Sequence, residues 1–308
     1  MLDFVIISGP TAVGKTRFVE NLAVEEKAEI ISADSQAVYK YLDIGTAKPE
    51  SKDNIKYHLI DVVDPDKNYD VSNFISDVED AVKRVRKKNK KILISGGTPM
   101  YINKLIYGLT DAPGKDEKIR NKLKKEAEKK GKDYLYEKLK KIDPVSAENI
   151  HENDLYRIIR ALEIYKITGK TRTFWHKKTP EPRYNYLYFI LNRDRKKLYN
   201  RINKRVDKMI EEGLVEEVKG LIEEKNYTGN EYGFNAIGYR EVIDYLNGNI
   251  DKDEMIRLIK RNTRRFAKRQ LIWFRKEEGT IEYNLSKVDE SLVLNDIIKE
   301  IKKRGGLK

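Results

Sequence analysis

The chain contains no cysteine and only three histidines among its 308 residues. The absence of cysteine excludes a disulfide framework, a thiolate zinc site and a cysteine nucleophile, and the scarcity of histidine disfavours histidine-centred catalysis. The sequence also lacks an apolar run of the roughly 18 residues that a membrane span requires, and its N-terminus has no signal-peptide pattern. We therefore expect a cytoplasmic protein that binds no membrane. Separately, we expect a monomer.

Charged residues are plentiful, but their balance changes along the chain. Residues 1–110 carry 16 basic and 16 acidic side chains, whereas residues 111–182 and 183–308 carry net charges of +6 and +7. One interpretation is an N-terminal catalytic unit followed by segments that meet a polyanion. The other interpretation is a set of solvated, lysine-rich helices.

Hydrophobic patterns predict strands that alternate with helices. Strand-like runs at 4–7, 29–33, 58–63 and 91–95 are separated by helical patterns at 16–28 and 71–88, which indicates a parallel α/β sheet. The charged segment 113–141 is helical in pattern with a break at Gly131, a further helix is expected at about 154–168 after an interruption at 143–144, and 174–184 has the composition of a linker. A strand at 186–191 then restores the sheet, followed by helices at 194–212, 214–224 and 251–275 and a strand at 280–284. We predict a parallel-sheet core of residues 1–110 and 183–308 with an all-helical insertion of residues 111–182.

The strongest local motif is Gly-Pro-Thr-Ala-Val-Gly-Lys-Thr at residues 9–16, a complete G-x-x-x-x-G-K-T between a predicted strand and a predicted helix. Its glycines let backbone N–H groups surround phosphate oxygens, Lys15 reaches the outer phosphates, and the Thr16 hydroxyl ligates Mg²⁺. The core is therefore predicted to be P-loop NTPase-like. The predicted diphosphate-binding residues are Gly9, Pro10, Thr11, Ala12, Val13, Gly14, Lys15 and Thr16.

The sequence gives only a weak signal for the acidic residue that usually accompanies nucleotide hydrolysis. The buried strand at 91–95 ends in Gly96-Gly97 without a carboxylate, and Asp61 is as well explained as a strand-end turn acid. An ATPase or kinase is therefore disfavoured. Asp34, in contrast, follows the second strand at the same sheet edge as the phosphate loop. There it can accept a proton from a bound substrate, or it is a turn aspartate. Thr98 is similarly placed to direct a hydroxyl into the cleft.

Residues 255–276 hold nine basic side chains and no acidic one. On a helix, the basic side chains form one face and the apolar side chains the opposite face. This pattern favours an RNA-binding or phosphate-binding surface over an ordinary solvated face. The basic face comprises Arg257, Arg261, Arg264 or Arg265, and Lys268, and the buried face Ile259, Phe266 and Trp273.

These motifs together carry a resemblance that runs in order from residue 5 to about residue 275. The segments GPTAVGKT, ISADSQAVYKYLDIGTAKP, HLIDVVDP, GGTPMYINKL, NDLYRIIRALEIYKITG, FNAIGYREV and AKRQLIWFR all resemble the tRNA dimethylallyltransferases, the bacterial-type tRNA isopentenyltransferase family. The stretch from Asp34 to Pro49 is the most specific of them. Other P-loop proteins do not share it.

The resemblance implies transfer of a dimethylallyl group from dimethylallyl diphosphate to the exocyclic amine of the adenosine that is 3′-adjacent to the anticodon in tRNA. Asp34 would accept the amine proton, while Lys15, Thr16 with Mg²⁺ and a core arginine stabilise the departing diphosphate. Arg201 best matches that arginine, Arg205 is a close second, and Thr98 would line the channel.

The resemblance also implies that the target base is flipped into the core and that the insertion holds the anticodon stem-loop. Together with the basic helix, it gives the predicted tRNA contacts Asp34, Ser35, Gln36, Ala37, Thr98, Arg120, Tyr156, Arg157, Ile158, Ile159, Arg160, Arg261 and Arg265. Two alternatives stay open: a prenyltransferase that acts on free adenine nucleotides, and a P-loop RNA kinase or ATPase.

Overall fold

The computed structural model describes residues 1–49, 55–176 and 181–308, and it divides the chain into two compact units. The first unit comprises Met1–Ile106 and Arg183–Lys308, and the second comprises Tyr107–Pro182. The sequence places the start of the insertion at residue 111, four residues after the start of the second unit. The first unit stops at Ile106 and resumes at Arg183. These two residues are in contact, because the backbone N–H of Arg183 donates to the Ile106 carbonyl at 2.8 Å.

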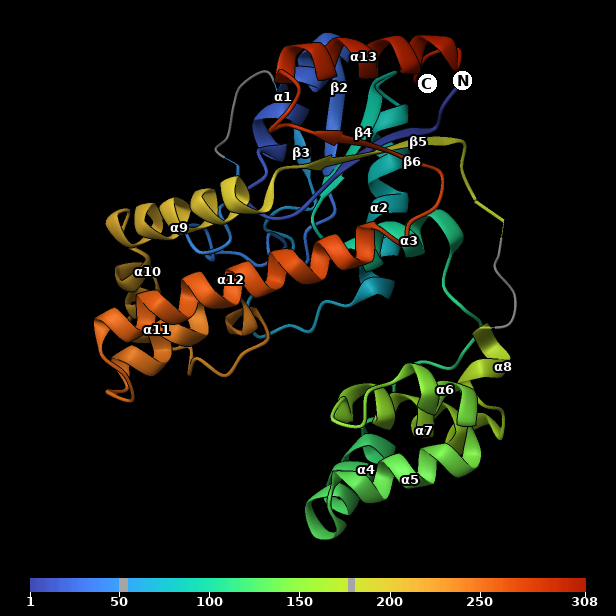
Figure 1. Ribbon diagram of the computed structural model, residues 1–308, viewed down its shortest axis with the longest axis vertical. Helices are drawn as coiled ribbons and strands as arrows, with labels where there is room; N and C mark the ends of the chain where they lie inside the picture. The colour runs from blue at the N-terminus through green and yellow to red at the C-terminus, as the bar shows by residue number, and fades with distance from the viewer. Residues whose placement is uncertain (50–54, 177–180) are drawn as a thin grey trace. The chain divides into compact units, whose positions relative to one another are not determined.

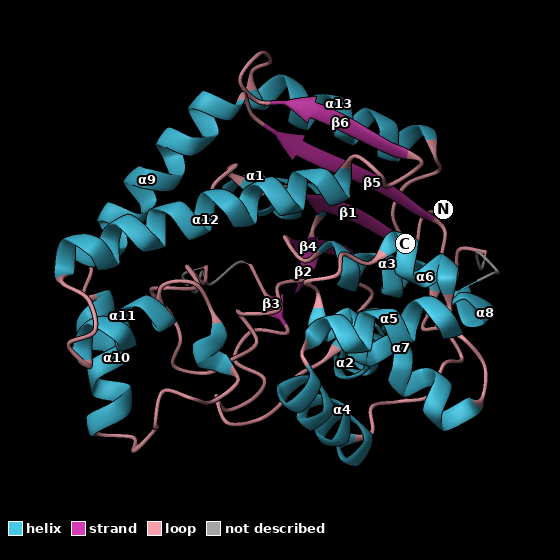
Figure 2. Ribbon diagram, turned by 60° about the horizontal axis from the view of Figure 1, so that its bottom comes forward, coloured by secondary structure: helices cyan, strands magenta, loops and turns pink. Residues whose placement is uncertain are grey.

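The first unit is built on a six-stranded sheet with the order β3-β2-β4-β1-β5-β6, in which every pair of neighbouring strands is parallel. Figure 2 shows the arrows of β1, β5 and β6 pointing in a common direction. The predicted P-loop-like parallel sheet is confirmed. Its strands are β1 (Phe4–Ser8), β2 (Ala28–Ser32), β3 (Tyr57–His58), β4 (Lys91–Gly96), β5 (Tyr186–Asn192) and β6 (Thr280–Asn284).

Successive side chains along each strand point to opposite faces of the sheet, so the sheet has a hydrophobic core on each face. Val5 and Ile7 of β1 belong to one cluster with Phe18 of a flanking helix, whereas Phe4 and Ile6 point to the other face and are equally buried. The helices of the first unit are α1 (Lys15–Glu26), α2 (Val71–Arg86), α3 (Pro99–Tyr107), α9 (Arg195–Glu211), α10 (Leu214–Glu223), α11 (Tyr239–Leu246), α12 (Lys252–Phe274) and α13 (Glu290–Lys303), with the 3₁₀ turn η1 (Gly233–Asn235). Figure 1 shows the C-terminal end of α13 near both chain termini.

The predicted strand at 58–63 is wrong beyond its first residue, because β3 ends at His58. Leu59 and Asp61 adopt positive φ angles of 62° and 56°, which extended strands do not accommodate. The chain instead runs beside residues 37–40: Asp61 N–H donates to Ala37 O, and Val62 N–H donates to Val38 O. This turn places residues 61–63 next to the segment that follows β2.

The second unit is entirely helical where it is described. Its core gathers Leu123, Leu135, Leu139, Ile158 and Leu162. Aspartate side chains cap the starts of α4 and α7, and Gly131 ends α4 with φ 85°. The helices are α4 (Glu117–Lys130), α5 (Lys132–Ile142), α6 (Pro144–Asn149), α7 (Leu155–Thr168) and α8 (Arg172–His176), the last of which begins just before the predicted linker.

No helix in the described parts of the chain is long and apolar enough to cross a membrane.

Candidate functional site

The glycine-rich loop, residues 9–16, joins the end of β1 to the start of α1. No residue with a side chain fits in place of Gly9, because a Cβ there would lie 2.2 Å from the Leu191 carbonyl oxygen. Gly14 caps α1 with φ 111°, which favours glycine. Lys15 Nζ donates to the carbonyl oxygens of Gly9 and Pro10 at 2.8 and 2.9 Å. The loop is thus wrapped around its own lysine at an N-terminal helix end, where anions are favoured.

Three long side chains from distant segments hold the loop from outside. Arg193 and Arg201 each donate through Nε at 2.8 Å, to the Val13 and Ala12 carbonyls respectively. Gln270 of α12 accepts from the Thr11 N–H at 2.9 Å and donates to the Gly97 carbonyl at 2.6 Å. The sequence prediction contained neither Arg193 nor Gln270 in this role. The only available signal for Gln270 was a glutamine within the motif AKRQLIWFR.

Asp34 lies directly after β2, at the sheet edge from which the glycine-rich loop also emerges. Its Oδ1 accepts backbone N–H groups of Gln36 at 2.9 Å and of Ala37 at 3.4 Å. The Ser35 N–H donates to Thr98 Oγ1 at 3.1 Å, and a Cβ on Gly96 would lie 2.1 Å from Ala33 O. The ends of β2 and β4 are therefore joined closely, and one Asp34 oxygen is engaged in a local turn.

These elements enclose a cavity of about 340 Å³ within the first unit. Lys15, Thr16 and Asp34 line it together with Arg205 of α9, whose guanidinium approaches Thr11 Oγ1 and the Thr46 carbonyl at 3.4 Å each. The further lining residues include Thr11, Ser35, Gln36, Gly45, Thr46, Ala47, Gly97, Val206, Met209, Ala236, Ile237, Ile259, Thr263, Phe266, Arg269 and Gln270. A cation-rich wall thus faces one carboxylate.

Burial controls the ionisation of the two deepest cations. Burial lowers the pKa of the Lys15 ammonium to about 8, although the Asp34 carboxylate acts in the opposite direction and Arg205 lowers it further. Burial also lowers the pKa of Arg205, again opposed by Asp34. Neither cation has a direct ion pair within the described chain. Such a wall is suited to holding an anionic group.

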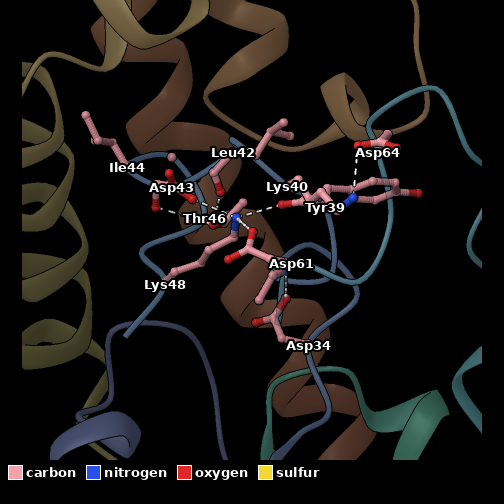
Figure 3. A network of polar contacts seen from close by, with 12 residues as sticks. Asp34, Tyr39, Lys40, Leu42, Asp43, Ile44, Thr46, Lys48, Asp61 and Asp64 are labelled. Atoms are coloured by element: carbon pink, nitrogen blue, oxygen red, sulfur yellow. Dashed lines mark hydrogen bonds and ion pairs between the residues drawn. The ribbon is translucent and has the colours of Figure 1, made fainter. Parts of the chain in front are cut away.

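The segment from Tyr39 to Lys48 forms another part of the wall and is organised by Lys48 (Figure 3). Only 7% of the Lys48 side chain is exposed, and its ammonium donates to Asp43 at 2.7 Å, Asp61 at 2.5 Å and the Tyr39 carbonyl at 2.6 Å. Asp61, the candidate acid for nucleotide hydrolysis, is therefore engaged with Lys48 and is absent from the residues that line the cavity.

Glu217 of α10 and Tyr239 of α11 hold the same segment from the opposite side. Glu217 Oε2 accepts the backbone N–H groups of Asp43 and Ile44, and its Oε1 accepts from the Tyr239 hydroxyl at 2.6 Å. A Cβ on Gly45 would lie 2.4 Å from the Tyr239 ring. Burial and the Glu217 carboxylate raise the pKa of Tyr239, so the hydroxyl stays protonated and donates. The cavity wall at residues 45–47 is thereby fixed.

We expect Lys48→Met to lower the free energy of unfolding by about 2–3 kcal/mol, because two carboxylates lose their shared cation and the Tyr39 carbonyl loses a donor. The loss stays below that of a fully buried pair, since Asp43 and Asp61 remain partly exposed. Lys40→Met is the matched control, as its pair with Asp64 is exposed and should contribute less than about 1 kcal/mol. Urea denaturation of both variants measures the difference, and equal losses would contradict a structural role for Lys48.

The structure brings six of the predicted core residues into the cavity wall: Thr11, Lys15, Thr16, Asp34, Ser35 and Gln36. Thr98 lies beside the wall, bonded to Ser35, and Arg201 lies outside it on the Ala12 carbonyl. The Ala37 side chain is buried, so a contact of this residue with RNA would have to involve its backbone. On α12, Arg265 is exposed and Arg261 is half-buried.

The predicted buried face of α12 is wrong at Trp273, which is 39% exposed. The face that is buried contains Met255, Ile259, Ala267, Gln270 and Phe274. The expected basic face is also partly paired within the protein: Arg257 bonds Glu254, and Arg264 bonds Asn203.

In the second unit, Tyr156 is 72% exposed and Arg157 lies beside it on α7. The side chains of Ile158 and Ile159 are buried in the hydrophobic core of this unit, so they are not available to RNA in this structure. The side chains of Arg120 and Arg160 converge on the fully buried Glu163. These two arginines therefore have a structural partner that the sequence did not reveal.

No cluster of three or more histidine, cysteine, aspartate or glutamate side chains that would cage a metal ion occurs among the described residues. The Thr16 hydroxyl at the cavity is instead suited to Mg²⁺, which usually takes few protein ligands and binds mainly through substrate phosphates and water.

Comparison with known proteins decides the family. The model of the IPP transferase family matches residues 37–277. The chain belongs to the IPP transferase family. This confirms the resemblance carried by the motifs.

Relatives of this IPP transferase match it over nearly its whole length. The tRNA dimethylallyltransferase of Carboxydothermus hydrogenoformans is 46% identical over 304 residues, 96% of each chain. The full-length tRNA isopentenylpyrophosphate transferase of Bacillus halodurans has a TM-score of 0.72 at 37% identity, with 99% of this chain and 98% of that one covered. A eukaryotic dimethylallyltransferase acting on tRNA has a TM-score of 0.80 at 28% identity, covering 98% of this chain and 78% of its own.

Proposed function

We propose that this IPP transferase is a tRNA dimethylallyltransferase. It transfers the dimethylallyl group of dimethylallyl diphosphate to the exocyclic amine of the adenosine that is 3′-adjacent to the anticodon. The observation that carries the proposal is a single cavity in which Lys15, Thr16 and Arg205 face Asp34. An anion-binding wall opposite one carboxylate is the arrangement that substitution of a diphosphate by a weakly basic amine requires.

Each of these residues has a separate role in the reaction. The amine nitrogen forms a bond to the first carbon of the dimethylallyl group, the bond from that carbon to the diphosphate oxygen breaks, and the diphosphate leaves with the bonding electrons. Lys15, Arg205 and the loop N–H groups stabilise the charge on the leaving group. Asp34 accepts the proton that the amine releases, through the oxygen that the local turn leaves available.

A bound Mg²⁺ ion would neutralise charge on the diphosphate, and the Thr16 hydroxyl is the residue that would hold it. Gln270 keeps the loop in register with the end of β4, and Thr98 positions Ser35 beside Asp34. We therefore assign Gln270 and Thr98 to positioning, and Arg205 rather than Arg201 to the diphosphate.

tRNA supplies the adenosine, and the exposed cations of both units are the candidate contacts to its backbone. Arg265, with the half-buried Arg261, is the candidate of the first unit, and Tyr156 with Arg157 is that of the second. The adenosine leaves its stack to enter the cavity, a step that costs a few kcal/mol and is offset by phosphate contacts.

One assay tests the function. The protein is incubated with Mg²⁺, dimethylallyl diphosphate and an anticodon stem-loop with an adenosine 3′-adjacent to the anticodon, and the RNA is weighed by mass spectrometry. We expect the gain of one C5H8 unit, and no gain when that adenosine is replaced by inosine, which lacks the amine. Prenylation of free adenosine monophosphate but not of the stem-loop would support a nucleotide prenyltransferase, and phosphate transfer from ATP would support a kinase. Either result would overturn the proposal.

The activity should fall on the alkaline side of pH 8. Lys15 of the free protein loses its charge as the pH rises through its lowered pKa of about 8, and an uncharged amine no longer attracts the diphosphate. We expect kcat/KM for dimethylallyl diphosphate to decrease above that pH, because kcat/KM reports on the free enzyme. The residual activity of Lys15→Arg should lack this decrease, since arginine stays protonated. A decrease of the same shape in that variant would assign the titration to another group.

A further inference from the structure

The cavity wall is charged near the glycine-rich loop and apolar farther from it. On α9, Arg201 bonds the loop carbonyl of Ala12, Arg205 follows one turn later at Thr11, and Met209 follows after another turn. Residues four apart on a helix are separated by about 6 Å along its axis. Met209 is therefore about 6 Å farther along α9 than the cation that approaches the loop.

On α12, too, the residues that line the cavity change from polar near the loop to apolar farther away, here toward the N-terminus of the helix. Gln270 bonds the loop at Thr11, whereas Phe266, Thr263 and Ile259 line the cavity at successive positions toward the helix N-terminus. Ile259 is eleven residues from Gln270, or about 16 Å along the axis. Both helices thus place an apolar residue at the end of the cavity that is remote from the loop.

The remote end is uncharged and tightly packed. Met209 and Ile259 are 8% and 2% exposed, and Val206, between Arg205 and Met209 on α9, is 2% exposed; Ala236 and Ile237 also line the cavity. Among the described residues that line the cavity, the charged ones are Lys15, Asp34, Arg205 and Arg269. Each belongs to the loop, to a strand end or to the helix segment nearest the loop.

We infer that Met209 and Ile259 limit the length of the prenyl group that the enzyme accepts. The inference rests on the proposed function: a diphosphate held by the loop fixes the first carbon near Arg205, and the alkyl chain extends away from the charged wall. A five-carbon group is accommodated, whereas a second isoprene unit meets the Met209 and Ile259 side chains. Packed apolar walls resist additional methylenes, and one methylene in such a pocket changes selectivity by about 10–200-fold.

The test measures a ratio of substrates. Values of kcat/KM are determined for geranyl diphosphate and for dimethylallyl diphosphate, with one anticodon stem-loop as acceptor. We expect the ratio of geranyl to dimethylallyl to rise by at least about tenfold in Met209→Ala, and to rise again in the double variant with Ile259→Ala. Met255→Ala is the matched control, because Met255 is a buried methionine one turn from Ile259 on α12 that does not line the cavity. Its ratio should equal that of the wild type.

Each outcome decides the inference. If Met209→Ala does not fold, Ile259→Val removes a single methyl group and should still raise the ratio by several-fold. An unchanged ratio in folded variants, or a raised KM for RNA alone, would overturn the inference and assign the apolar end to the base. Failure of the wild type to use dimethylallyl diphosphate would instead overturn the proposed function.

Discussion

Asp34→Asn is expected to lower kcat for prenyl transfer by about 10²–10⁴-fold, the usual contribution of a positioned general base. The substitution is well matched to its purpose. An asparagine oxygen accepts the Gln36 and Ala37 N–H groups as Asp34 Oδ1 does, so the turn after β2 is retained. The amide, however, does not accept the amine proton. Single-turnover kinetics with saturating RNA and dimethylallyl diphosphate measure the loss.

The KM for dimethylallyl diphosphate separates this role from a structural one. Removal of the carboxylate takes away a charge that repels the diphosphate, but it also takes away the group that raises the pKa of Lys15. At a pH well below that pKa, where Lys15 stays charged, binding of the diphosphate should be retained or strengthened. The melting temperature should also stay close to that of the wild type. A normal kcat would exclude Asp34 as the base. A kcat loss accompanied by an equal loss of diphosphate binding would indicate that the variant has disturbed the cavity itself.

Arg205→Gln is expected to lower kcat/KM for dimethylallyl diphosphate by about 10²–10³-fold, as removal of one preorganised donor to a developing anion typically does. Arg205 lines the cavity, whereas Arg201 is exposed and bonds the outside of the loop. Arg201→Gln is the paired variant, and we expect it to reduce the activity by tenfold or less. The reverse order of the two effects would assign the diphosphate to Arg201.

Arg205→Gln should not destabilise the fold. Arg205 is desolvated, and its two contacts at 3.4 Å are weak replacements for water. Replacing such a cation by a neutral side chain removes a burial penalty, so the free energy of unfolding should be unchanged or higher. Loss of activity with retained stability is the expected sign of a side chain that is held for its substrate. Chemical denaturation measured alongside the kinetics tests this.

Local patterns were sufficient to predict most of the sheet and the glycine-rich loop, because consecutive residues determine them. The buried face of α12 illustrates the limit. Ile259, Phe266 and Trp273 follow a strict seven-residue spacing, and such a spacing drifts by about 20° per step around a helix of 3.6 residues per turn. The packed face follows Ala267, Gln270 and Phe274 instead. The drift was enough to place Trp273 on the exposed side.

The supports of the site could not be predicted, because they connect residues that are distant in sequence. Gln270 bonds Thr11, and Glu217 bonds Asp43 and Ile44. Nothing in the neighbourhood of a surface-compatible glutamate predicts a partner more than 170 residues away. The motifs predicted roles for Lys15 and Asp34, but only the folded chain reveals which side chains hold these residues in position.

The hydrogen bond between Arg183 and Ile106 means that the helical unit is inserted like a long loop between two points that already touch. The entropy of closing a loop grows only with the logarithm of its length. For the 76 residues of Tyr107–Pro182, the excess over a five-residue turn is on the order of 2 kcal/mol. Carrying such a module therefore imposes little thermodynamic burden on the unit that holds the glycine-rich loop.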